Sequence, residues 1–489
     1  MAEITTMDRI NMILRDPQHT PMSMADIVGE EIRQFKASDA YHHMVQAEEY
    51  YLNRSDVQNK CNSLTKRSNT RIERPILKKL VDQKVNYLLS KPWTVETEHR
   101  GYGMALNEVF DPIFRRKIKS MGRGAIKSGI AWLQPYFGDD GKLAWMRVPS
   151  TELVPLWRDA ERTVLDAFIR FYSQTVYLGT RKHTIHRAEF WFSGGVRYFV
   201  SPVDNPSAYM PDKEHGSEST GWTEPHFKVN GRAYNWEQVP IVWLRYNEEE
   251  LPLCYWIKDL IDDINWQTSV TADVLRDVAN FVYVLRNYGG TDLDEFVREL
   301  RETLAIKVEG DGGVDKLQAD LNIDAAMAFL DMQRRDVYDY AAGVDTKDPE
   351  LGNASGTAIN FRYMDLDTDC QALATEFQDT FLHLKPFVDT YLQLMGRGDF
   401  SREQYTVIFN ADLPVNETDV INNVVASTGT LSQRTLLQNH PWVRDVDQEL
   451  AQIDEEEQRR MDAYGAGLFD NIANTTPAES GDADGEEKG

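Results

Sequence analysis

Helical patterns on both sides of a short β–α–β segment constrain the fold of this chain more than any other feature. The first helical pattern covers residues 251–280, where apolar residues recur at helical spacing and aspartates fall between them. Two β runs follow, Phe281–Leu285 and Ala305–Val308, with an amphipathic helical segment, Leu293–Leu300, between them. A second helical pattern covers about 323–342. This order predicts a small β–α–β tip carried on two helices.

A polar connection over residues 344–357 separates the second helical pattern from a longer one at about 358–395. Its glycines and Asn353 permit unusual backbone dihedrals. A connection of this length between two helices is more often functional or disordered than a simple linker. We take it as a candidate functional loop, with a disordered connector as the alternative. Its candidate residues are Asp345, Lys347, Asp348, Glu350, Asn353 and Ser355.

Two stretches within this region, Phe281–Gly289 and Ile306–Leu317, resemble the portal proteins of tailed bacteriophages, in the siphophage-type family. The order of the elements resembles the same family, as do Leu80–Leu88 and Val239–Asn247. The resemblance covers about residues 50–465 and implies an α+β portal fold. That fold has an α/β wing, a two-helix stem, a small β–α–β clip, a long wing helix after a tunnel loop, and a helical C-terminal crown.

The resemblance also implies a division of the chain into segments. These are 1–250 for the N-terminal segment and wing, 251–280 for the first stem helix, 281–322 for the clip, 323–343 for the second stem helix, 344–357 for the tunnel loop, 358–412 for the long helix and a wing strand, 413–470 for the crown, and 471–489 for an acidic tail. The composition of the tail, which lacks apolar periodicity, predicts disorder.

In function, the resemblance implies a homo-oligomeric ring of about twelve subunits at one vertex of the capsid. Double-stranded DNA passes non-specifically through its channel during genome packaging and ejection. The implied partners are the terminase large subunit, capsid and scaffolding proteins, and later head-completion and tail adaptor proteins. The protein is then expected in the virion, and in the host cytoplasm during assembly. No cofactor is expected.

The resemblance further implies roles for two sets of residues. In the portal family the tunnel loop projects into the channel and touches DNA. We expect Lys347 to face the phosphates, while Asp345, Asp348 and Glu350 keep the contact weak. The tip, or clip, is the expected docking surface for partner proteins. Its candidate residues are Asn287, Tyr288, Asp292, Glu295, Arg298 and Arg301.

The charge of the chain argues against a tight grip on nucleic acid. Its formal net charge is −25 and its pI is about 4.9, whereas tight binding needs a basic surface that releases counterions from phosphates. An acidic chain suits a channel that passes DNA. Three scattered cysteines fit a reducing compartment. The chain starts without a signal-peptide pattern and contains no apolar run long enough to cross a bilayer, so we expect no membrane.

Residues 54–91 reverse this charge, with ten Lys or Arg residues against three Asp or Glu. Apolar residues at helical spacing predict a helix over 76–89 that ends at Ser90–Pro92. Its cations either face an anionic partner, which is DNA or an acidic neighbouring subunit, or form a solvated helix face. The acidic stretch 447–457 is a candidate for the complementary face that a cyclic assembly requires.

No catalytic or metal-binding constellation is predicted. The chain contains no Gly-rich phosphate loop ending in Lys-Ser/Thr, and Gly310–Gly313 indicates a turn. Asp365–Asp369 with Glu376 has the spacing of a calcium loop, but Cys370 stands where the turn needs glycine, so we expect one helix. We therefore do not expect an enzyme. The alternatives are a phage DNA-metabolism enzyme, such as a metal-dependent nuclease, and a non-portal head–tail adaptor.

Shorter patterns predict the remaining elements. Strands are expected near 132–137, 143–148, 164–172, 184–192, 196–200, 239–247 and 405–409, and helices near 24–32, 115–128 and 417–464. Residues 201–235 indicate a variable loop, and Ser432 is a candidate helix N-cap. Pro386 is expected to kink or break the long helix near Leu382–Lys385, because it lacks a backbone donor and clashes with the preceding turn.

Overall fold

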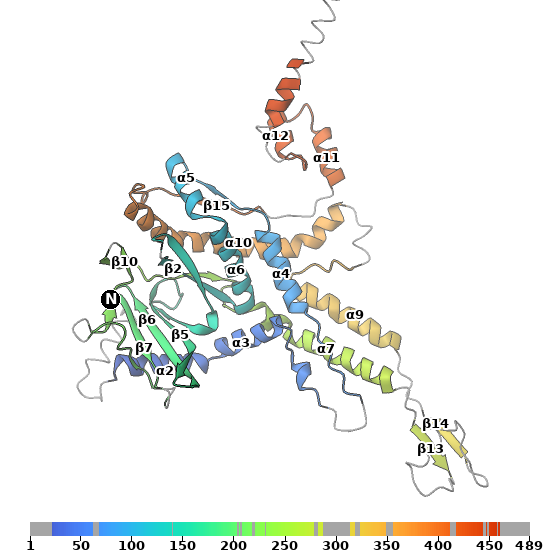
Figure 1. Ribbon diagram of the computed structural model, residues 1–489. Coiled ribbons are helices and arrows are strands. Elements are labelled where there is room, and N and C mark those ends of the chain that lie inside the picture. Colours follow the sequence, from blue (N-terminus) through green and yellow to red (C-terminus); the bar gives the residue numbers. More distant parts are fainter. Residues whose placement is uncertain are drawn as a thin grey trace, which may run out of the picture. The chain divides into compact units, whose positions relative to one another are not determined.

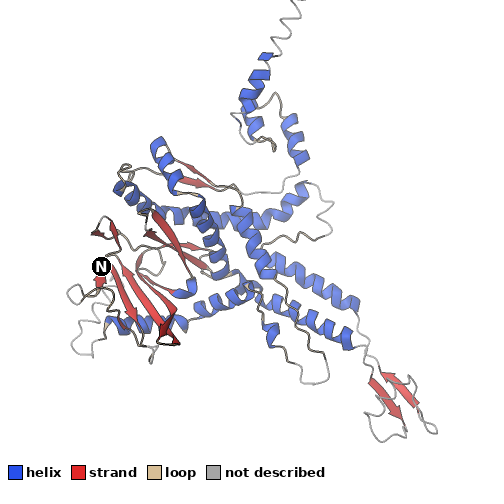
Figure 2. Ribbon diagram, in the orientation of Figure 1, coloured by secondary structure: helices blue, strands red, loops and turns tan. Residues whose placement is uncertain are grey.

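The computed structural model describes most of the chain. The described residues are 22–61, 68–138, 140–202, 205, 208–217, 221–229, 231–277, 282–286, 313–317, 323–348, 356–410, 417–443, 446, 449–456 and 458–459. The chain divides into two compact units, Met1–Asp348 with Arg362–Asp412 and Pro349–Phe361 with Leu413–Gly489, and each is described by itself. Helices and antiparallel sheets occur together, which confirms the predicted α+β class (Figures 1 and 2).

Most helices of the first unit enclose one large apolar core. In chain order the helices are α2 (Met24–Lys36), α3 (Asp39–Tyr51), α4 (Ile76–Leu89), α5 (Arg100–Val109), α6 (Pro112–Ser128), α7 (Leu253–Asp277), α9 (Ile323–Tyr340) and α10 (Gly356–Leu394). Phe114 from α6 and Phe381 and Phe387 from α10 are each at most 2% exposed. Burying a side chain of this size stabilises the fold by roughly 1.5–3 kcal/mol.

The strands of the first unit form antiparallel sheets. A three-stranded sheet has the order β12–β2–β3, with β2 (Ile130–Phe137), β3 (Leu143–Val148) and β12 (Val242–Arg245). A six-stranded sheet has the order β4–β5–β6–β7–β8, and β9 also pairs with β7. Its strands are β4 (Leu153–Trp157), β5 (Leu165–Leu178), β6 (Arg181–Phe192), β7 (Gly195–Val200), β8 (Met210–Pro211) and β9 (Thr223–Glu224). The pairs are β1–β15 (Thr94–Glu96 and Thr406–Ile408), β10–β11 (Phe227–Val229 and Arg232–Tyr234) and β13–β14 (Val282–Arg286 and Gly313–Leu317).

The helix α2 packs on the six-stranded sheet. Ser23 begins the helix with a capping box, in which side chain and backbone groups satisfy each other's free donors. The apolar face of α2, which includes Val28 and Ile32, shares a separate core with Ile169 and Phe190 of the sheet. The sequence therefore places a short amphipathic helix over a sheet that would otherwise leave one apolar face open.

A close crossing of two backbones sets where α7 begins. The residue after α6 is Gly129, with a φ of +82°, which glycine adopts at little cost. A Cβ at this position would lie 1.8 Å from the carbonyl oxygen of Glu250. The N–H of Tyr246 donates to the Gly129 carbonyl at 2.8 Å. Only glycine fits this crossing, which holds the end of β12 against the end of α6.

The helices α7 and α9 lie side by side (Figure 1). Gln333 of α9 donates a hydrogen bond to Asp263 of α7. Their apolar faces meet through Ile257 and Ile261 of α7 and Val337 of α9, which belong to the large core. The chain continues from α7 to β13, which pairs with β14 before α9 begins.

Three polar side chains of α7 hold an extended segment along the helix. Asn265, Ser269 and Asp273 accept hydrogen bonds from the backbone N–H groups of residues 74, 72 and 70, at 3.1, 2.9 and 2.6 Å. Four residues of helix rise about 6 Å, and two residues of extended chain about 6.6 Å, so the two spacings match. Lys60 forms an ion pair with Asp273. The segment is thereby fixed without a second strand.

Several predicted elements are confirmed. The helix over 76–89 is α4, and the hairpin near 132–148 is the antiparallel pair β2–β3. Asp365–Glu376 lies within α10, so it forms one helix and no calcium loop. Ser432 caps α12, where its side chain accepts from the N–H of Thr435.

Other predictions are wrong in part. Gly313–Leu317, predicted as the end of a turn and a lead into the helix, is the strand β14, and Ala305–Val308 lies outside the described residues. Residues 201–235 contain four short strands and are not only a loop. The strand β4 was missed, because Pro155 within it lowers the strand propensity.

Of the predicted kink or break at Pro386, the break is wrong, because α10 continues through it to Leu394, and the kink stays a prediction. Pro386 is exposed, whereas Leu384, Phe387 and Val388 on either side of it are at most 1% exposed. The helix therefore keeps its apolar face in the core despite the missing donor.

The second unit contains α11 (Glu417–Ala426) and α12 (Gln433–Gln438). Residues 449–456 are helical as well, in the stretch where an acidic helix is predicted. The tail, 471–489, lies outside the described residues.

We predict that Pro386→Ala stabilises the protein. Alanine restores the backbone donor and removes the ring from the helix interior, and the exposed site has little packing to lose. The expected gain is about 1–3 kcal/mol in the free energy of unfolding, measured by urea denaturation. A loss of stability would show that the helix depends on a local distortion at this residue.

We predict that the segment held by α7 loosens at acidic pH. Burial raises the pKa of Asp273, but hydrogen bonds from Lys60 and Thr70 outweigh it, so the pKa lies below its ordinary value of 3.8. The stabilisation is present above that value and is lost as pH falls through the lowered pKa. The free energy of unfolding of the wild type should exceed that of Asp273→Asn by roughly 1–3 kcal/mol near neutral pH. This difference should disappear in acid.

The control is Ser269→Ala, which removes a hydrogen bond of the same row without removing a titratable group. Urea denaturation across the acid range measures the difference in free energy of unfolding between the wild type and each of the two variants. A difference for Asp273→Asn that stays constant with pH would contradict the assignment.

Candidate functional site

The candidate loop begins where α9 ends. α9 ends at Tyr340 and α10 begins at Gly356, close to the predicted ends of the two helical patterns. Residues 341–348 are described, and we call them the loop root. The remaining candidates, Glu350, Asn353 and Ser355, lie outside the described residues.

Ion pairs engage both acidic candidates of the loop root. Asp345 Oδ2 lies 2.6 Å from Arg334 Nη2 of α9, and Asp345 Oδ1 lies 3.8 Å from Lys79 Nζ of α4. Asp348 Oδ2 lies 2.5 Å from Arg362 Nη1 of α10. These carboxylates are balanced within the chain and are not presented as free negative charges.

Lys347 differs from these neighbours. Its side chain is exposed, and no described residue forms an ion pair with it. Its backbone N–H donates to Asp345 Oδ1 at 3.1 Å, a local turn that asparagine and aspartate favour. Of the described candidates, Lys347 is therefore the one with a charge open to an external anion.

Two side chains of α4 hold the loop root. Gln83 Nε2 donates to the Val344 carbonyl at 2.9 Å, and the Val344 N–H donates to Gln83 Oε1 at 3.1 Å. Lys84 Nζ donates to the Ala342 carbonyl at 3.1 Å. The Lys84 side chain is 0% exposed, and its ammonium lies 2.7 Å from Asp369 Oδ2 of α10.

Asp369 also contacts the joint between β12 and α7. The Tyr246 hydroxyl donates to its two carboxylate oxygens, at 3.1 and 3.3 Å. Burial, and then the Asp369 carboxylate, raise the pKa of Tyr246 well above its ordinary value. Burial raises the pKa of the neighbouring Cys370 thiol to about 12. Tyr246 therefore remains a hydrogen-bond donor, and Cys370 a neutral core residue.

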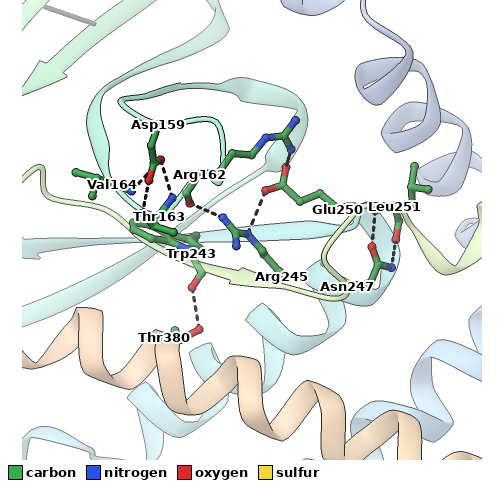
Figure 3. A network of polar contacts seen from close by, with 10 residues as sticks. All are labelled: Asp159, Arg162, Thr163, Val164, Trp243, Arg245, Asn247, Glu250, Leu251 and Thr380. Atoms are coloured by element: carbon green, nitrogen blue, oxygen red, sulfur yellow. Dashed lines mark hydrogen bonds and ion pairs between the residues drawn. The ribbon is translucent and has the colours of Figure 1, made fainter. Parts of the chain in front are cut away.

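Figure 3 shows what fixes this joint. Arg245 Nε donates to Glu250 Oε1 at 3.2 Å and Arg162 Nη1 lies 2.5 Å from Glu250 Oε2. A further hydrogen bond runs from Arg245 to the Arg162 carbonyl. Asn247 closes the turn through two 2.8 Å hydrogen bonds with the backbone of Leu251. The start of α7 is thus held by charged and amide groups together.

A hydrogen bond joins β12 to α10, and a cavity lies near the joint between β12 and α7. Thr380 of α10 donates to the Trp243 carbonyl at 2.8 Å (Figure 3). A cavity of about 630 Å³ lies beside the loop root. Its lining includes Tyr246, Trp256, Tyr340, Ala342, Asp369 and Glu376. Burial raises the pKa of Glu376.

The clip candidates are not placed. Asn287, Tyr288, Asp292, Glu295, Arg298 and Arg301 lie outside the described residues.

The basic stretch 54–91 is engaged within the chain to a large extent. Five of its cations form intramolecular ion pairs, namely Arg54, Lys60, Lys78, Lys79 and Lys84. Their partners come from α3, α4, α7, the loop root and α10. Lys60 and Lys84 are buried, so a solvated face does not account for these two residues, whereas the side chains of Arg54 and Lys78 remain more than half exposed.

Sequence reasoning missed the side chains that hold the loop root. Lys84 lies at helical spacing from Leu77, Leu80, Val81 and Leu88, inside the buried face of α4. A lysine in an apolar stripe is a usable signal for a buried ion pair, because a charge is rarely buried without a partner. The identity of the partner could not follow, since Asp369 is 285 residues away.

In the part of the chain that the structure describes, no group of three or more His, Cys, Asp or Glu side chains could hold a metal ion. The described helices include none that is both long and apolar enough to span a membrane.

The polar groups of the site hold a loop and the joint between a sheet and a helix in fixed positions, which is a structural role. A family model described as "Phage portal protein, SPP1 Gp6-like" matches residues 37–463. The portal protein of Bacillus phage SPP1 is 30% identical over 429 residues, covering 86% of this chain and 81% of that protein. The portal protein of Clostridium phage phiCD119 is 26% identical over 442 residues, covering 86% and 94%.

The chain belongs to the phage portal protein family. Its function is that of a portal protein, a channel at the phage capsid for genome packaging and ejection. Portal proteins form oligomeric rings in phage capsids and are structural, non-enzymatic components of the virion. The resemblance inferred from the sequence is confirmed.

Proposed function

We propose that this chain forms a cyclic ring of about twelve copies, in which the loop root lines the channel that double-stranded DNA passes. The assembly would form in the host cytoplasm and become part of the capsid vertex. The net charge of −25 supports passage over a tight grip, because a chain of negative net charge repels phosphates.

We base the channel assignment on which charged side chains of the loop root form ion pairs and which one is exposed. Asp345 and Asp348 are occupied by ion pairs, while Lys347 is exposed. An ammonium acts as a point charge without directional recognition. One lysine per subunit therefore contacts any phosphate of the DNA backbone equally and weakly. Such a contact suits non-specific sliding of DNA.

The partner proteins are a further part of the proposal. The clip, residues 281–322, would dock the terminase large subunit during packaging and head-completion or tail adaptor proteins afterwards. Capsid and scaffolding proteins would surround the ring. The pair β13–β14 supports this role, because it forms a separate two-stranded element that follows α7 and precedes α9 in the chain.

We also propose that the chain has no enzymatic activity of its own. A nuclease would be revealed by cleavage of plasmid DNA with magnesium or manganese. A non-portal adaptor would be revealed by the size of its assembly.

Native mass spectrometry of the purified full-length protein tests the ring. We expect assemblies of about twelve copies, and negative-stain images of the same sample should show a central hole. A monomer or dimer at every salt concentration, with or without scaffolding protein, would contradict the proposal.

We predict that Lys347→Glu weakens the binding of short double-stranded DNA to the assembled ring. The substitution changes every subunit, so each phosphate contact that is lost lowers the salt dependence of binding by about one unit of slope, and the new charge repels the backbone. The measurement is fluorescence anisotropy of labelled DNA over a range of salt concentrations. Lys228→Glu, on an exposed position of β10, is the control with the same change of charge. Equal losses for both variants would show that only net charge matters.

A further inference from the structure

We propose that Gln83, Lys84 and Asp369 form a polar lock that positions the loop root, and so couples the placement of α4 and α10 to that of the channel loop. Its functional meaning rests on the proposed role of the loop, whereas the lock itself rests on contacts within the chain.

Gln83 acts on the backbone of Val344 as a neighbouring strand would. Its amide gives one hydrogen bond and takes another, at 2.9 and 3.1 Å. Val344 is 3% exposed, so water cannot easily replace these bonds if Gln83 is lost. The residue thereby fixes both the position and the orientation of one peptide of the loop root.

Lys84 joins three elements through one ammonium group. It contacts the Ala342 carbonyl and the Asp369 carboxylate while wholly buried in α4. Ala342 stands just after the end of α9 with a φ of +46°, a conformation that non-glycine residues seldom adopt. A cation at the C-terminal end of a helix is favoured by the unpaired carbonyls there. Lys84 therefore stabilises the turn that leads out of α9.

Steric fit limits the loop root to this position. A Cβ on Gly343 would lie 2.5 Å from Cδ2 of Leu80, so the backbone of the loop root lies directly on α4. Lys79, one turn earlier on α4, donates to the Tyr338 hydroxyl at 2.8 Å and also lies near Asp345. Contacts from one face of α4 thus extend from the end of α9 into the loop root.

A cavity lies beside the polar lock. The cavity of about 630 Å³ is lined by Ala341 and Ala342 of the loop root as well as by Asp369. Tyr246, which donates to Asp369, belongs to the joint that begins α7. Displacement of α4 relative to α10 would separate Lys84 from Asp369 and leave the turn at Ala342 free to move into this space. The lock is therefore a positioning device that links the body of the subunit to the loop.

The test uses the full-length protein and hydrogen exchange of a peptide that covers residues 341–348. Gln83→Leu removes only the two bonds to Val344, and we expect exchange there to rise about tenfold or more. Lys84→Met should raise it too, with a lower melting temperature, because the variant leaves Asp369 without its cation. Lys385→Met is the matched control, since Lys385 is a buried lysine of α10 paired with Asp389 at 2.6 Å and distant in sequence from the loop root.

A double variant separates positioning from stability. Lys84→Met with Asp369→Asn removes both charges and leaves the asparagine able to accept from Tyr246. We expect the melting temperature to recover toward wild type while exchange of the loop root stays at least about tenfold fast. Recovery of both readings, or a loop root in Gln83→Leu that exchanges as in wild type, would overturn the proposal. An equal rise in Lys385→Met would also overturn it.

Native mass spectrometry of the same wild-type sample keeps the two proposals apart. Normal rings with unchanged loop exchange in the variants would reject the lock alone. Absence of rings in wild type would reject the proposed assembly, while the exchange data would still decide the lock.

Discussion

A buried ammonium group lies where α4, the end of α9 and α10 meet. Lys84 is 0% exposed, and among apolar residues its ammonium group contacts Asp369 and the Ala342 carbonyl. An uncompensated charge at this depth would cost several kcal/mol, so the contacts of Lys84 favour the arrangement in which the three elements meet. The position of the loop root follows from this arrangement, as does the contact between Asp369 and Tyr246.

The start of α7 is fixed by constraints of a different kind. Gly129 allows two backbones to cross at a distance that no Cβ permits, and Arg245 with Glu250 holds the turn that follows. Along α7, Asn265 and Ser269 accept hydrogen bonds from the backbone of an extended segment and hold it in place. Shape, charge and hydrogen bonding thus each hold a separate part of the same helix, which gives the portal body a firm base for the helix pair α7 and α9.

The sequence predicted those features that depend on local patterns. The apolar periodicity around Cys370 correctly indicated one helix through Asp365–Glu376, and the order of elements indicated the family. Features that depend on distant partners were not accessible. β14 contains Gly313 and Asp315, residues that disfavour strands, and forms because β13 pairs with it. Asp345 and Asp348 look like free acids in the sequence, yet their partners Arg334 and Arg362 come from the two flanking helices.

The central claim is that α4 and α10 hold the loop root at the channel of the ring. Cryo-electron microscopy of the assembled ring tests it most directly. The account predicts that residues 341–348 line the central channel, with Lys347 toward its axis and the contacts of Gln83 and Lys84 retained. A ring in which the loop root lies on the outer surface, or in which Lys84 is separated from both Ala342 and Asp369, would contradict it.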